Sequence, residues 1–150
     1  MNRILLYAAL VVASVATSPV LYSQQPKTIH NMQCAMTVPA DWIQRGSASA
    51  HAPEPKTSVA FVRLIVPDDA KMMREAIKNG SMANVKARIV DDNDRRLVVQ
   101  MQPIGLNGKP MNRLQLMTKG NPGCQGRVDF EDPSDVSAAR KIVDTTTGAN

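Results

Sequence analysis

The sequence predicts an α+β domain, in which two helices pack on an antiparallel sheet of about six strands. Short segments with strand periodicity recur along the chain, turn residues connect the last four of them, and two other segments repeat apolar residues at helical spacing. Packing both helices on one sheet buries all of these apolar stripes, so the order of the elements predicts the fold class.

The N-terminus is typical of a secretory signal peptide, which we place at residues 1–23. Arg3 precedes an apolar run that is too short to span a bilayer. Cleavage after Ala16 or after Ser23 suits the residues there, and the later site is preferred. The mature chain, residues 24–150, is expected to be one exported domain, periplasmic or secreted, without a transmembrane anchor.

Apolar periodicity and turn residues place the six strands. In the first, residues 32–38, apolar residues alternate with other residues. In the second, residues 57–66, apolar residues occupy both faces except at Arg63. The last four are expected to form a meander, over residues 83–90, 95–102, 111–118 and 124–130. Residues 44–56 have no apolar period and are expected to form a mobile loop.

Two helices are predicted from their end signals. The first runs from Asp69 to Asn79, with Asp68 as N-cap and Gly80 as the C-terminal stop. The second begins after Asp132, which can cap it and is followed by a proline suited to the first helical position. One apolar face is expected for this last helix, made by Val136, Ala139, Ile142 and Val143.

Three short motifs resemble the PsbP-like superfamily of small α/β sandwiches. They are V-P-A-D-W at 38–42, L-N-G-K-P at 106–110 and K-I-V-D-T-T at 141–146, and the likeness spans residues 29–146. The resemblance implies a binding or accessory protein rather than an enzyme, and it supplies no catalytic residues. The cysteines are not part of that superfamily's general pattern.

The two cysteines, Cys34 and Cys124, fall in the first and last predicted strands of an exported chain, which favours one disulfide. Such a bond should stabilise the fold by roughly 4 to 5 kcal/mol in the chain-entropy model. Two unpaired core thiols are the alternative, and a redox-active pair is disfavoured because C-x-x-C spacing is absent. Trp42, the only tryptophan, is expected to pack against the sheet edge.

Residue patterns typical of catalysis or metal binding are weak in this sequence. His30 lies in the N-terminal lead-in and His51 in the expected loop, where no packed shell would orient either ring. The acidic run 91–94 lacks the glutamate that closes a calcium loop and is interpreted as a solvated hairpin turn. We therefore expect no catalytic residue, no metal and no cofactor.

Charge provides the one functional lead. Strand alternation predicts a basic sheet face made by Lys86, Arg88, Arg113 and Arg127, with Gln115 and Met117 beside them. The formal net charge falls only from +5 to +4 when the leader is removed. Few aromatic residues remain for stacking, which argues against nucleic acid as a partner. The alternative is a solvated face balanced by acidic residues at 129–135.

These observations predict a non-enzymatic exported binding, accessory or inhibitor protein. It is expected to be a monomer that contacts an acidic protein or an anionic surface through the basic sheet face or the 44–56 loop. The alternative hypothesis is a small secreted hydrolase in which His51 closes over Asp41 or Asp92.

Overall fold

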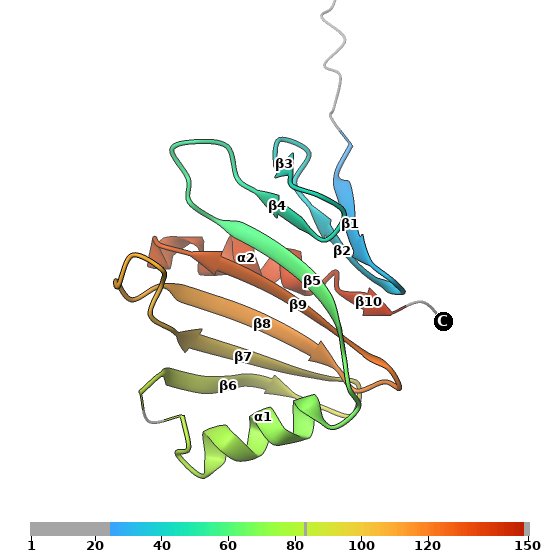
Figure 1. Cartoon of the computed structure of the whole chain (residues 1–150), viewed down its shortest axis with the longest axis vertical. Coiled ribbons are helices and arrows are strands. Elements are labelled where there is room, and N and C mark those ends of the chain that lie inside the picture. Colours follow the sequence, from blue (N-terminus) through green and yellow to red (C-terminus); the bar gives the residue numbers. More distant parts are fainter. Residues whose placement is uncertain (1–24, 83, 149–150) are drawn as a thin grey trace, which may run out of the picture.

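The protein folds as two antiparallel sheets with two helices (Figure 1). A computed structural model describes residues 25–82 and 84–148, so the expected signal peptide at 1–23 lies outside the described residues. Seven strands form the larger sheet in the order β3-β4-β5-β9-β8-β7-β6, and three form the smaller one in the order β1-β2-β10. The predicted α+β class, with two helices and antiparallel strands, is confirmed.

The strands are β1 (Lys27–Asn31), β2 (Cys34–Val38), β3 (Ile43–Gln44), β4 (Ser49–His51), β5 (Val59–Ile65), β6 (Lys86–Asp92), β7 (Arg96–Gln102), β8 (Asn112–Thr118), β9 (Gly123–Phe130) and β10 (Thr147–Gly148). The helices are α1 (Asp69–Lys78) and α2 (Val136–Val143), and a 3-10 turn, Pro133–Asp135, leads into α2. The expected single sheet of about six strands is therefore wrong. Strands of two or three residues, such as β3, β4 and β10, are too short to show a period.

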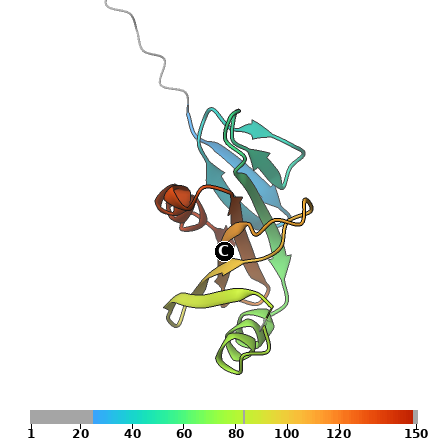
Figure 2. The same ribbon diagram turned by 90° about the vertical axis from the view of Figure 1, so that its left-hand side faces the viewer.

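Both faces of the larger sheet are covered, because α1 packs on one face and α2 on the other (Figure 2). The smaller sheet lies on the same side as α2, and together they enclose the main core around Leu114, Leu116 and Phe130. A second, smaller core under α1 contains Leu97, Val99 and Met117. Burial on both faces explains why β7 carries an unbroken apolar run.

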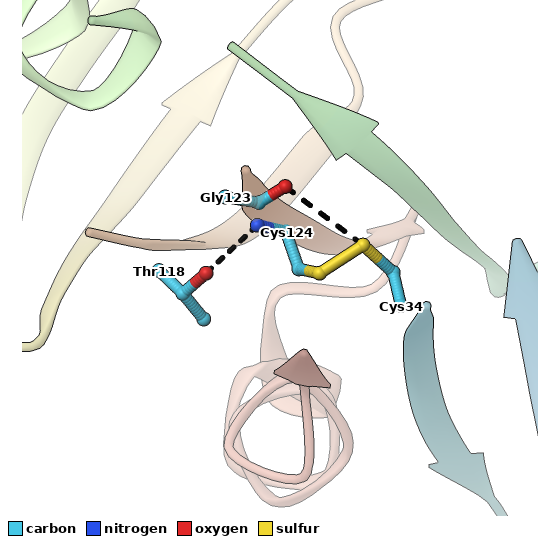
Figure 3. Close-up of a disulfide and its surroundings, with 4 residues drawn as sticks. All are labelled: Cys34, Thr118, Gly123 and Cys124. Carbon is cyan, nitrogen blue, oxygen red and sulfur yellow. Dashed lines mark hydrogen bonds between the residues drawn. A yellow bond between two sulfur atoms is a disulfide. The ribbon is translucent and has the colours of Figure 1, made fainter. Parts of the chain in front are cut away.

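The predicted disulfide is confirmed (Figure 3). Cys34 on β2 and Cys124 on β9 are joined with 5.5 Å between their Cα atoms, so the bond ties the smaller sheet to the larger. Nearby, the Cys124 backbone N–H donates to the Thr118 hydroxyl at 2.7 Å. The Cys34 sulfur lies 3.8 Å from the Gly123 carbonyl oxygen. This is a contact and not a hydrogen bond, because a disulfide sulfur carries no hydrogen.

The predicted helix ends are largely confirmed. Gly80 follows α1 with a positive φ of 68°, as the C-terminal stop requires. Asp132 caps the 3-10 turn, since its carboxylate accepts the Ser134 N–H at 2.8 Å. At the start of α1 the cap differs, because Asp68 makes no side-chain cap bond and the Asp69 carboxylate instead accepts the Val66 N–H at 3.2 Å.

Residues 44–56 contain regular structure that the sequence did not predict. Within this segment β4 pairs with both β3 and β5, and Ala50 and Ala52 are buried. Small residues fill the space here, so the segment packs without a visible apolar period. Trp42 is buried as expected, at 7% exposure, and belongs to the main core.

Acidic residues at the end of β6 make ion pairs rather than a solvated turn. Asp92 pairs with Arg74 of α1 at 2.7 Å and with Lys119 at 2.8 Å. Asp91 pairs with Arg96 at 2.8 Å and lies 3.4 Å from Arg140 of α2. These carboxylates are therefore already neutralised by neighbouring cations.

Over residues 25–82 and 84–148, neither helix is long and apolar enough to cross a membrane.

Candidate anion-binding groove

The predicted basic face is divided between the two sides of the larger sheet. Arg113 is paired with Met101 and Asp129, while Arg88 is paired with Gln100, which is itself opposite Leu114. Directly paired residues share a face, and neighbours along a strand lie on opposite faces. Arg113 and Arg127 therefore face α1, whereas Lys86 and Arg88 face the other side, so the expected grouping of all four is wrong.

The error has a physical cause. We expected every strand of the meander to present one parity to a single core, which would place Ala87 and Ile89 beside Leu114 and Leu116. The sheet instead has a core on each face, and Ala87 and Ile89 pack under α1 while Leu114 and Leu116 pack under α2. Strand alternation reports which residues share a face along one strand but not which face each strand buries.

Between α1 and β9 lies a groove of about 510 Å³, which we call the arginine groove. This volume is within the range of small-molecule sites. Its polar lining consists of Arg63, Arg113, Arg127, Gln115, Gln125 and Asp69, and its apolar lining consists of Met72, Met73, Met82, Met101, Met117, Ala76, Val85 and Pro103. Arg63 lines the groove in place of the predicted Lys86 and Arg88. The sequence feature that could have indicated it is that Arg63 is the single charged residue in an otherwise apolar strand.

Two of the three arginines are held by neighbouring side chains. Arg113 donates two hydrogen bonds to Asp129, from Nε at 2.6 Å and from one terminal nitrogen at 3.0 Å. Arg63 donates from Nε to the side-chain oxygen of Gln125, a buried residue on the facing strand. Both guanidinium groups are thereby fixed in position on the sheet.

Arg127 is the least satisfied of the three. Its Nε is buried without a hydrogen-bond partner, and the nearest carboxylate oxygen, on Asp129, is 3.6 Å away. The guanidinium carbon lies 4.5 Å from the centre of the Phe61 ring, which supports it from below. Burial lowers the pKa of Arg127, and the positive charges of Arg113 and Arg63 add to this while Asp129 opposes it. An arginine nevertheless stays protonated at neutral pH.

The groove floor is also polar and incompletely bonded. Gln115 is only 3% exposed, and its amide nitrogen donates to the thioether sulfur of Met117 at 3.3 Å. A thioether is a weak acceptor, so this amide is poorly satisfied for a buried group. Charge is unbalanced as well, because three guanidinium groups face the carboxylates of Asp129 and, at the rim, Asp69.

His51 lies far from Asp92, one of the two partners that the hydrolase hypothesis gives it. His51 is on β4, where its Nε2 accepts a hydrogen bond from Arg45 at 3.0 Å and its Nδ1 lies 3.0 Å from the Ala52 carbonyl oxygen. Asp92 is on β6, five strands away in the sheet order, which corresponds to roughly 24 Å. Asp92 therefore cannot orient His51, and both ring nitrogens are already engaged.

The hollows elsewhere on the surface are weaker candidates for a functional site. Hollows on either side of residues 53–56 are lined partly by Trp42 and partly by His51, and there Lys56 lies 3.8 Å from Asp135. Across the described ranges, no cluster of three or more His, Cys, Asp or Glu side chains could hold a metal. The arginine groove contains the unpaired Arg127 Nε and the weakly bonded Gln115 amide, and it is therefore the candidate site.

No family model and no curated protein matches this chain. Among solved structures, the chain is similar to a crystal structure of a protein from Bacteroides thetaiotaomicron VPI-5482, with a TM-score of 0.56 and 14% sequence identity. The match covers 84% of this chain and 49% of that one, so this chain spans about half the length of the structure it matches. At this identity the likeness concerns the fold alone.

Proposed function

We propose that this protein is an exported, non-enzymatic binding protein that holds the anionic group of a ligand or partner in the arginine groove. The observation that carries the proposal is Arg127, which lines the groove with a side chain that is 32% exposed and whose Nε has no hydrogen-bond partner. Arg63 and Arg113 stand beside it, and Asp129 offsets only one of the three positive charges, so an anion there would meet an excess of positive charge.

The chemistry of the lining supports binding rather than catalysis. Guanidinium groups, amides and thioethers are poor general acids and bases at neutral pH, and Asp129 is held by two N–H groups of Arg113. Export is supported by the apolar N-terminal run and by the disulfide, because such bonds persist in oxidising compartments. Membership of the PsbP-like superfamily is part of the proposal, and the three motifs quoted above support it.

The test is an NMR titration of the arginine Nε–H resonances with acetate and with inorganic phosphate at low ionic strength. We expect saturable shifts at Arg63 and Arg127. Replacing Arg127 by Gln should weaken binding about tenfold, the loss expected for one charge-assisted hydrogen bond.

The matched control is Arg88→Gln, which removes the same charge from the opposite face of the sheet. This variant should bind both anions like the unmodified protein. Equal losses in the two variants would mean that only the overall charge attracts anions, and the groove would then have no binding role.

A further inference from the structure

We infer that the arginine groove takes an amphipathic carboxylate, with the carboxylate on the arginines and a flexible aliphatic chain along the methionines beneath α1. This inference rests on the proposed function and specifies its ligand class. The supporting observation is a change of polarity across the sheet, from strand to strand along each row of paired residues.

The rows run perpendicular to the strands and can be followed from the pairing registers. One row reads Phe61, Arg127, Gln115, Val99 and Ile89, from β5 across β9, β8 and β7 to β6. A neighbouring row begins at Arg63 and Gln125 and continues through Met117 to Leu97. Each row is cationic or polar on β9 and apolar on β7.

The same division continues in the walls of the groove. The α1 side contributes Met72, Met73 and Ala76, and the segment after the helix contributes Met82 and Val85. Five of the chain's nine methionines line this one groove. Unbranched thioether side chains adapt their shape to irregular apolar partners, which suits a flexible chain better than a rigid ring.

The dimensions agree with a ligand that has a charged head and an apolar tail. The cationic strand β9 and the apolar strand β7 are separated by one strand, a distance of about 10 Å. A compact anion such as phosphate would satisfy Arg127 but leave the methionine wall open to water. An apolar molecule without charge would remove water from the Arg127 guanidinium group and supply no acceptor in its place, which is costly.

The experiment measures decanoate binding by calorimetry, below the concentration at which it forms micelles, with acetate as the short carboxylate. Each fully buried methylene should tighten binding about fourfold. Decanoate has eight more methylenes than acetate, so we expect roughly 250-fold tighter binding if about half of them are buried. Arg127→Gln should weaken both ligands by a similar factor.

Two matched sets of controls separate head from tail. Decanol and decyltrimethylammonium have the same tail with a neutral or cationic head, and both should bind at least tenfold more weakly than decanoate. The double variant Met72→Gln with Met82→Gln should weaken decanoate about tenfold and leave acetate unchanged, because both side chains belong to the apolar wall of the groove and not to its arginine side. Met32→Gln, at the exposed β1–β2 turn, should change neither.

The outcomes distinguish this inference from the proposed function. Equal affinity for acetate and decanoate, still dependent on Arg127, would overturn the amphipathic ligand and leave an anion-binding groove. Decanol binding as tightly as decanoate would also overturn it, because the head would then not be recognised. Absence of binding by all the carboxylates would overturn this inference, and absence of phosphate binding as well would overturn the proposed function.

Discussion

Gly126 on β9 lies where the segment after α2 approaches the larger sheet most closely. A Cβ atom there would lie 1.9 Å from the Thr146 hydroxyl oxygen and 2.8 Å from the Met36 sulfur. Both neighbours are buried, so neither can move aside freely. The glycine is thus required by space, since interiors are packed too densely to admit an added methyl group.

Replacing Gly126 by Ala should lower the free energy of unfolding by about 1 to 3 kcal/mol, the usual cost of overpacking a core. Urea denaturation measures the change. Gly148→Ala is the matched control, because its added Cβ would meet the Cys124 sulfur at an ordinary 3.5 Å. A Gly126 variant as stable as the control would show that the smaller sheet can shift away from β9.

At the scale of elements, the end of β6 connects to both helices. Asp92 reaches Arg74 of α1, and the preceding Asp91 reaches Arg140 of α2. Neighbouring residues on a strand face opposite sides, so two adjacent carboxylates hold helices that lie on different faces. Lys119, from the turn between β8 and β9, completes the pairing of Asp92.

The Asp92 pairing predicts a pH dependence. The hydrogen bond from Lys119 has the largest effect and lowers the pKa of Asp92 below its ordinary value; burial opposes it, and the hydrogen bond from Arg74 adds to the lowering. A lowered folded-state pKa means that the ionised form stabilises the fold above pH ~4, and that this contribution is lost as the pH falls through the folded pKa.

We therefore expect Asp92→Asn to lower the free energy of unfolding at pH 7 by about 0.5 to 1 kcal/mol, a value limited by solvent screening. The difference from the unmodified protein should shrink as the pH falls below ~4, through the lowered folded-state pKa of Asp92. Denaturation at several pH values measures it. Asp94→Asn, on the adjoining turn, should show no such convergence, and a gap that stays constant with pH would exclude the ion pairs as its cause.

The elements that the sequence predicts well are those with strong local signals. Asp132 and Gly80 mark helix ends through their own backbone chemistry, which depends little on the rest of the fold. Strands β3, β4 and β10 have two or three residues each and are formed by pairing with distant segments. Their sequences carry no period from which they could be predicted.

At the scale of the whole molecule, the arrangement of the site depends on layers that no single strand reveals. Gln115 and Met117 were correctly grouped with Arg113 and Arg127, because those residues alternate along β8 and β9. Lys86 and Arg88 were misplaced because β6 packs the residues that alternate with them, Ala87 and Ile89, against the core under α1. Arg63 joins the site only through the pairing of β5 with β9, which are far apart in sequence.

The disulfide supports this layered arrangement by linking strands of the two sheets. Replacing both Cys34 and Cys124 by Ala should reduce the free energy of unfolding by roughly 4 kcal/mol, because a long loop in the unfolded chain is no longer closed. Urea denaturation measures the loss, and thiol titration of the unmodified protein, unfolded without reductant, should detect no free thiol. A loss below about 1 kcal/mol would mean that packing alone fixes the two sheets.

The same bond determines how the protein would respond to mechanical force. Cys34 and Cys124 are 90 residues apart, so the intervening chain forms a covalent ring that contains β3 to β8 and α1, and with them most of the arginine groove. Pulling on the two ends of the described chain could extend only the residues outside the ring, about 110 Å instead of roughly 400 Å after reduction. Tension would thus be carried across β2 and β9 and would bypass the ring, so a protein stretched between two attachments could keep the ring closed while its terminal strands peel away.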